Sequence, residues 1–164
     1  MPQAYYRNYQ HIVFSTKGRR RSLHPPILTI VEESIRKTCR DYGVTILEMN
    51  GTLDHLHLLL NIPPKHAVSN IVRAIKGNSS IMLNDGGHLF AWQAGYSAFS
   101  VSESNVAAVR LYILGQVEHH RRRSFDDEFV ALLEKHGIQV GTDGKVPSGQ
   151  EDLPDVSPRA AALG

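Results

Sequence analysis

The chain has 164 residues, of which 41% are hydrophobic, so it can bury the core of one domain and is too short for two comfortable ones. Its net charge of +2 is uneven: residues 1–140 carry 16 basic and 12 acidic side chains, and residues 141–164 carry 2 and 4. No apolar run is long enough to span a membrane. The lone Cys39 and an N-terminus without the apolar core of a secretory signal indicate a reducing, cytoplasmic location.

The first half of the chain predicts one strand, one helix and two further strands. Residues 8–16 are rich in β-branched and aromatic side chains and predict a strand. Two prolines at 25–26 open a segment with helical apolar spacing that closes at Gly43. Residues 44–49 and 55–62 predict two strands, joined by a hairpin turn at Asn50-Gly51.

The second half predicts a helix, a strand and two more helices. Apolar spacing from Val68 indicates a helix that ends near residues 84–87, and residues 96–101 alternate as a short strand. A third helix is expected from Ser102 or Ser104 to about His120, and a fourth from Ser124 to Gly137. The order βαββαβ predicts an α+β, ferredoxin-like (RRM-like) sandwich with additional C-terminal helices, its antiparallel sheet covered on one face and free on the other. We expect this domain to span residues 1–140 and residues 141–164 to be a disordered tail.

Two histidines, His55 and His57, are spaced i, i+2 within the third predicted strand. Alternation places both on one face, opposite the face that carries Leu56, Leu58 and Leu60. Neutral imidazoles at this spacing are suited to a divalent metal and leave positions open for phosphate oxygens. The competing interpretation is a pair of surface or hydrogen-bonded histidines without a metal. Asp54 alternates to the other face, so we do not expect it to bind the metal directly.

The third predicted helix carries a polar stripe next to its apolar face. Tyr112, Gln116 and His119 follow one another at helical spacing beside the apolar Val106, Val109, Ile113 and Val117. A phenol is a poor nucleophile near neutral pH unless nearby positive charge stabilises the phenolate. The sequence shows no dedicated base, although His119 and His120 are close along the helix. Tyr112 could equally be a core residue whose hydroxyl lies at the rim.

Basic residues gather in two short runs and on the second predicted helix. Such clusters are typical of surfaces that bind a phosphate backbone, and solvated loops are the simpler alternative. The residues that we expect to contact nucleic acid are Lys17, Arg19, Arg20, Arg21, Arg73, Lys76, Arg121, Arg122 and Arg123.

Three separated segments carry a resemblance to a known family. They are Asp54–Leu59 (DHLHLL), Ala91–Ser102 (AWQAGYSAFSVS) and Tyr112–Phe125 (YILGQVEHHRRRSF). In this order they resemble the small insertion-sequence transposases with a His-hydrophobic-His (HUH) motif and a single catalytic tyrosine, including those associated with repetitive extragenic palindromes. The resemblance covers roughly residues 5–140. Gly115 departs from the usual pattern, in which a polar residue is more common.

The resemblance implies a mechanism and partners. It implies that His55, His57 and Gln116 bind Mg²⁺ or Mn²⁺, and that Tyr112 attacks single-stranded DNA to form a 5′-phosphotyrosine, with no nucleotide cofactor. It also implies recognition of DNA hairpins by a homodimer, in which one subunit's tyrosine helix can complete the other's metal site. The alternatives are a catalytically idle or host-adopted single-stranded nucleic-acid-binding protein, a nickase of the replication-initiator type, and a small metal-binding regulator.

Overall fold

The computed structural model describes residues 3–140 and divides the chain into two compact units, one ending at Ser124 and one beginning at Phe125. The first unit contains a four-stranded sheet in the order β2-β3-β1-β4. Its strands are β1 (Tyr9–Ser15), β2 (Thr45–Gly51), β3 (His55–Asn61) and β4 (Ser97–Val101), and every neighbouring pair is antiparallel. The predicted α+β fold is therefore confirmed. None of the helices in residues 3–140 has the length and apolar character needed to cross a membrane.

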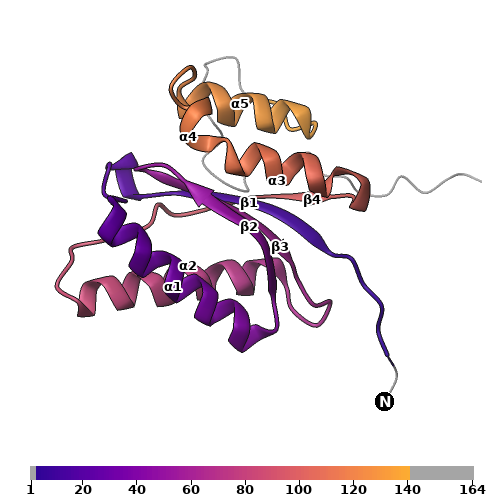
Figure 1. Ribbon diagram of the computed structural model, residues 1–164, viewed down its shortest axis with the longest axis horizontal. Helices are drawn as coiled ribbons and strands as arrows, with labels where there is room; N and C mark the ends of the chain where they lie inside the picture. The colour runs from indigo at the N-terminus through magenta and orange to yellow at the C-terminus, as the bar shows by residue number, and fades with distance from the viewer. Residues whose placement is uncertain (1–2, 141–164) are drawn as a thin grey trace, which may run out of the picture. The chain divides into compact units, whose positions relative to one another are not determined.

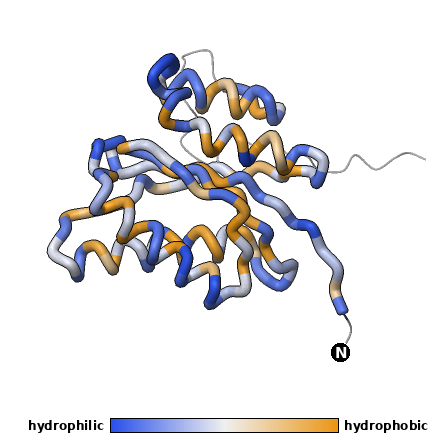
Figure 2. Tube along the Cα trace, in the orientation of Figure 1, coloured by the Kyte–Doolittle hydropathy of each residue, from blue (hydrophilic) through white to orange (hydrophobic). Residues whose placement is uncertain are grey.

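Two long helices cover one face of the sheet (Figure 1). They are α1 (Pro25–Tyr42), which ends at Gly43 in the left-handed conformation, and α2 (Val68–Asp85). Hydrophobic and hydrophilic residues alternate along both helices (Figure 2), so each turns an apolar stripe towards the sheet. Ile12 of β1 and Leu58 of β3 are paired across the sheet and pack with Ile35 and Ile75 in this core. Burial of each such side chain contributes about 1.5–3 kcal/mol.

The opposite face of the sheet, predicted to be free, is partly covered by α3 (Val106–Leu114), which follows the short 3-10 turn η2 (Glu103–Asn105). Ile113 packs there against Tyr9 and Leu59, with Val109 at the edge. Asn50 of β2 fastens the end of α3, because its Nδ2 donates to the carbonyl oxygens of Ile113 at 3.0 Å and Leu114 at 3.1 Å. The last carbonyl groups of a helix have no regular i→i−4 donor, so this side chain supplies a donor for two of them.

The third predicted helix is not continuous, so the prediction of one helix extending to about His120 is wrong. Gly115, with φ −81° and ψ 6°, separates α3 from the short α4 (Gln116–His119). Glycine is a poor interior helix residue, and the change of direction leaves Val117, predicted to continue the apolar face, 58% exposed.

The predicted hairpin turn is also displaced. β2 continues through Gly51, and the turn is formed by residues 52–54, where the amide of Thr52 donates to the His55 carbonyl oxygen at 3.0 Å. Gly51 is required for close approach: a Cβ there would lie 2.4 Å from the His55 carbonyl oxygen.

The described part of the second unit is α5 (Phe125–Lys135) and the residues that follow it to 140. Its first turn carries Asp126, Asp127 and Glu128, a favourable placement of negative charge at a helix N-terminus. Gly137, with φ +75°, follows the helix end as predicted. The tail prediction for residues 141–164 lies outside the described residues.

We expect Gly51→Ala to lower the free energy of unfolding by about 1–3 kcal/mol, because its Cβ would collide with backbone at His55. Gly77→Ala is the matched control: a Cβ at this site in α2 meets no atom within 4 Å, so the same substitution should stabilise the chain by about 0.5–1 kcal/mol. Urea unfolding of the full chain measures both. Unchanged stability of Gly51→Ala would contradict the close approach.

Candidate metal centre and tyrosine

His55 and His57 project from β3 towards the face that α3 covers. Both are 1% exposed, so the strand alternation was predicted correctly, but the histidines are buried and not at the surface. His55 Nδ1 lies 2.7 Å from Asp54 Oδ1 and 2.8 Å from Thr52 Oγ1. The hydrogen bond with His55 is the main reason that the pKa of Asp54 is lowered. Asp54 thus orients His55 by holding a hydrogen on Nδ1, which leaves the Nε2 lone pair available.

His11 is a buried member of the site that the sequence analysis missed. It lies on β1, opposite Leu59, and its Nε2 is 2.9 Å from His57 Nδ1. If His57 presents Nε2 to a metal, Nδ1 carries the hydrogen and donates it to His11. Residues 8–16 were predicted as a strand, but only the register between β1 and β3 brings His11 to His57. The pairing of His11 with Leu59 would have identified His11 as a neighbour of His57, because alternation along β3 puts Leu59 and His57 on the same face.

Burial and the proximity of other rings favour the neutral forms of His57 and His120. Desolvation is the largest reason that the pKa of His57 lies well below 6.5, and the neighbouring His11 and His55 rings lower it further. The pKa of His120 falls to about 4, chiefly through burial and then through the adjacent His55. Neutral rings retain the lone pairs that metal binding requires.

Tyr112 and Gln116 approach the histidines from α3 and α4. The Tyr112 ring packs edge-on against His57 and His11, with centroids 5.8 and 5.9 Å away. Gln116 is fully buried, and its Oε1 lies 3.0 Å from His120 Nε2. The structure therefore brings the predicted phenol, amide and histidine pair together within one chain.

The two accessory histidines occupy different positions. The His119 ring lies edge-on to Tyr112, with centroids 5.7 Å apart. His120 instead approaches the motif histidine of β3, with its Nε2 3.1 Å from His55 Nε2. The polar stripe predicted as Tyr112, Gln116 and His119 thus continues through His120 as well.

The donor chemistry of this cluster fits a divalent metal. One ring nitrogen of His55 and one of His57 lie within 4.8 Å of each other, and the amide oxygen of Gln116 is joined to His55 through His120 Nε2. Imidazoles suit borderline cations such as Co²⁺ and Zn²⁺, whereas an amide oxygen also suits the harder Mn²⁺ and Mg²⁺, of which imidazoles bind Mg²⁺ the more weakly. The orientation of both motif histidines by hydrogen bonds at Nδ1 is typical of metal centres.

The predicted nucleic-acid contacts are spread over several surfaces. Lys17, Arg20, Arg21, Arg73 and Arg123 are exposed. Arg121 and Arg122 lie 3.3 and 4.0 Å from Glu118, which offsets part of their charge. Arg19 is partly buried and its charge contributes to the lowered pKa of Asp54.

Lys76 is held in place by two backbone carbonyl groups. Its Nζ donates to the carbonyl oxygens of Gln93 and Gly95, both at 2.7 Å, and its pKa is lowered by desolvation. This ammonium ties α2 to the segment that leads into β4. Its contact with DNA stays a prediction.

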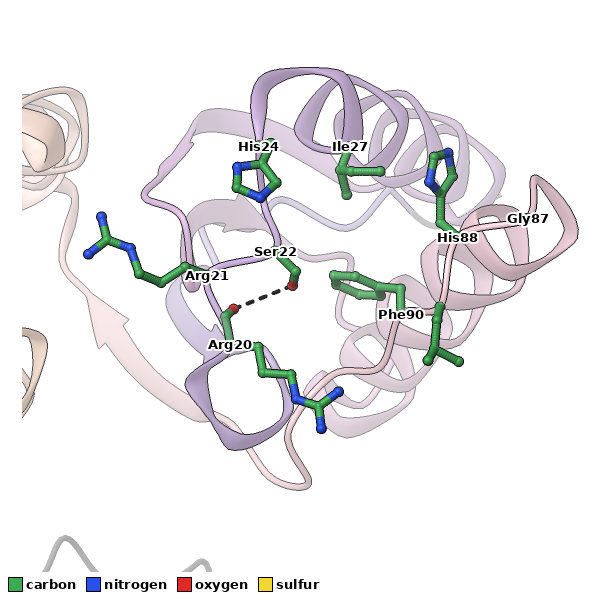
Figure 3. Close-up of a pocket in the computed structure, with 9 residues that line it drawn as sticks. Arg20, Arg21, Ser22, His24, Ile27, Gly87, His88 and Phe90 are labelled. Carbon is green, nitrogen blue, oxygen red and sulfur yellow. Dashed lines mark hydrogen bonds between the residues drawn. The ribbon is translucent and has the colours of Figure 1, made fainter.

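A basic pocket of about 390 Å³ lies between the segment before α1 and the segment after α2. Arg20, Arg21 and His24 line it from one side, and His88 and Phe90 from the other. In Figure 3 the Phe90 ring points into the pocket, while the two arginine side chains extend from one loop in different directions. No acidic side chain lines it among residues 3–140. Such a surface combines cationic groups with an apolar ring.

A comparison of the sequence with known protein families assigns the chain to one of them. The model of the family "Transposase IS200 like" matches residues 4–116. The chain belongs to this family. It is therefore a DNA-binding, DNA-processing enzyme of the kind that mobile elements use for transposition.

Individual relatives agree with this assignment. The chain is 37% identical over 119 residues to the transposase for insertion sequence element IS200 of Salmonella typhimurium, covering 68% of this chain and 78% of the relative. It is 28% identical over 116 residues to the ISDra2 transposase TnpA of Deinococcus radiodurans, covering 65% of this chain and 81% of the relative.

Two solved structures share the fold. A crystal structure of a proposed transposase from Deinococcus radiodurans R1 matches with a TM-score of 0.58 and 26% identity, over 71% of this chain and 95% of that one. A REP-associated tyrosine transposase bound to a REP hairpin also gives a TM-score of 0.58, at 17% identity, over 94% and 99% of the two chains. At that identity the second match supports the fold alone.

We expect His11→Leu to lower the free energy of unfolding by about 1–3 kcal/mol, because the buried His57 Nδ1–H loses its acceptor. It should also weaken Mn²⁺ binding by about 10–100-fold, the usual effect of removing a group that orients a metal ligand. His11→Gln keeps an acceptor and should recover most of the affinity. Urea unfolding, Mn²⁺ titration and ¹⁵N chemical shifts of the His57 ring test this. A leucine variant with normal affinity and unchanged His57 shifts would remove His11 from the site.

Proposed function

We propose that this IS200-like transposase cleaves and rejoins single-stranded DNA through a covalent 5′-phosphotyrosine at Tyr112. The observation that carries the proposal is the edge-on packing of the Tyr112 ring against His57, with centroids 5.8 Å apart, in a cluster where His55 is buried as well. A phenol next to a group of metal-binding side chains is the arrangement that activation of a tyrosine nucleophile requires. The resemblance of the His-Leu-His and Tyr-x₃-Gln segments to single-tyrosine transposases points the same way.

The proposed reaction exchanges one phosphodiester bond for another. The Tyr112 hydroxyl loses its proton, its oxygen bonds to phosphorus, and the bond from phosphorus to the 3′ oxygen breaks. The 3′ oxygen takes a proton and leaves as a free hydroxyl, and the 5′ phosphate stays on the protein. His119, whose ring contacts the Tyr112 ring, is a suitable acceptor for the phenol proton. Attack by a 3′ hydroxyl on the phosphotyrosine reverses these steps and rejoins the strand, so no nucleotide cofactor is needed.

A divalent cation, Mg²⁺ or Mn²⁺, would be held by His55, His57 and Gln116. When bound, it supplies positive charge that polarises the phosphate and favours the phenolate. The chain's own contribution is to bury these donors and to orient them. Asp54 holds His55 and His11 holds His57, each through Nδ1.

The proposed substrate is a DNA hairpin, and the proposed assembly is a homodimer. The solved REP-associated relative is bound to a REP hairpin, and the basic pocket offers this chain a surface for phosphates. Leu111, Leu114 and Val117 are 71%, 54% and 58% exposed on α3 and α4. Apolar side chains in such proximity are typical of a protein interface, which supports pairing through these helices.

The covalent step is tested by incubating the protein with a labelled single-stranded hairpin and Mn²⁺, followed by denaturing electrophoresis. We expect a protein-linked DNA band that Tyr112→Phe abolishes, because the substitution removes the attacking oxygen. Tyr96→Phe is the matched control and should form the band normally, since Tyr96 is 40% exposed on another segment. Linkage by Tyr112→Phe would overturn the proposal, and hairpin binding without linkage by the natural chain would favour the idle binding module.

DNA contact at the basic pocket is tested by the double substitution Arg20→Ala with Arg21→Ala. We expect weaker hairpin binding and a slope of log K against log salt that is shallower by about 1–2, because each lost phosphate contact removes about 0.7–0.9 of a counterion. The charge-matched control is Arg36→Ala with Arg40→Ala, two exposed arginines of α1. Fluorescence anisotropy at several salt concentrations measures the slope. Equal slopes in both double variants would exclude the pocket as a specific contact.

A further inference from the structure

His120 occupies a position in the cluster that the metal-ligand set implied by the family resemblance leaves unused. Gln116 is the first residue of the short α4, and His120 directly follows that helix, four residues after Gln116. Residues four apart on a helix lie on the same side. The Gln116 amide and the His120 imidazole therefore lie together, with Oε1 3.0 Å from Nε2.

The distances from His120 Nε2 to two neighbouring polar atoms match the spacing between ligands of one metal ion. This nitrogen lies 3.1 Å from His55 Nε2 and 3.0 Å from Gln116 Oε1. Donor atoms at adjacent corners of an octahedron, each about 2.1 Å from the cation, are separated by roughly 3.0 Å. The His120 nitrogen is therefore spaced from two expected ligands as a third ligand of the same ion would be.

Hydrogen bonding accounts for the close approach of these three atoms. His55 carries its hydrogen on Nδ1, which faces the Asp54 carboxylate, so its Nε2 is an acceptor. Gln116 Oε1 is an acceptor as well. A hydrogen on His120 Nε2 can bridge both atoms, so these two acceptors converge on a positive N–H group, as they would on a bound cation.

We propose that His120 is a direct metal ligand, so that the cation is bound by His55, His57, His120 and Gln116. This inference rests on the proposed metal centre. When the cation is bound, the His120 hydrogen resides on Nδ1 and Nε2 provides the lone pair. A set of three imidazoles and one amide oxygen favours Mn²⁺, Co²⁺ or Zn²⁺ over Mg²⁺.

The same geometry defines a clear alternative. His120 could instead hold His55 and Gln116 together through its N–H and give way when a cation binds to them. In that case removal of the His120 ring would leave metal affinity unchanged or increase it, since nothing would compete for His55 and Gln116. A direct ligand predicts the opposite sign.

The test is a titration of the full chain with Mn²⁺ in the absence of DNA. Electron paramagnetic resonance measures the concentration of free Mn²⁺ at each step. We expect His120→Ala to raise the Kd at least tenfold, and His120→Gln, which offers an amide oxygen, to recover part of the affinity. His66→Ala removes an imidazole outside the cluster, one whose Nε2 lies 2.9 Å from the Tyr42 carbonyl oxygen, and should leave the Kd unchanged. Electron spin echo modulation from imidazole nitrogen counts the ligands, with three expected in the natural chain and two in His120→Ala. Circular dichroism of each variant checks that the fold is retained.

The outcomes separate this inference from the function on which it rests. The assignment of His120 would be overturned if His120→Ala bound Mn²⁺ with the Kd of the natural chain or with a lower Kd. A count of only two imidazole ligands in the natural chain would overturn it as well. His55→Ala should weaken binding under either assignment. If His55→Ala binds Mn²⁺ normally, the proposed metal centre itself fails.

Discussion

Docking of α3 onto the histidine-bearing face of the sheet is the constraint on which the site depends. Ile113 is buried against Tyr9 and Leu59, and Asn50 binds the last carbonyl groups of the helix. Asn50 pairs with His57 across β2 and β3, so the polar anchor is adjacent to the motif histidine in the sheet. Tyr112 precedes Ile113, and its distance from the imidazoles is therefore set by the packing of its neighbour. The apolar contact and the polar anchor act on the same helix end.

The site has a large desolvation cost that hydrogen bonds must offset. His11, His55, His57 and Gln116 are all buried, and buried polar groups are costly unless they have partners. The two motif histidines solve this differently: His55 faces a carboxylate, whereas His57 faces another imidazole. A carboxylate strengthens the ligand next to it more than a neutral ring does. The two motif histidines are therefore chemically unequal, although they occupy equivalent positions of one strand.

The chemistry and the basic pocket occupy different regions of the first unit. The histidines face α3, whereas the pocket lies at the start of α1 and after α2, the two helices that cover the opposite face of the sheet. Membership of the IS200-like family requires the protein to bind DNA and to process it. Under the proposed function, the hairpin and the strand that Tyr112 attacks contact separate surfaces. The loop from Thr16 to Leu23 links them, because it begins where β1 passes beside His55.

Local patterns in the sequence determined the elements, the strand face shared by His55 and His57, and the presence of a phenol and an amide one helical turn apart. These depend on periodicity and on Gly and Pro signals between near neighbours, as at Gly43 and Pro25. Tertiary structure alone decided that His11 supports His57, that Asn50 fastens α3, and that His120 reaches His55, because these contacts join residues 46 to 65 positions apart. It also decided that the turn follows Gly51 and that the helix breaks at Gly115. A local signal marks a glycine, but strand register and helix docking determine which conformation that glycine adopts.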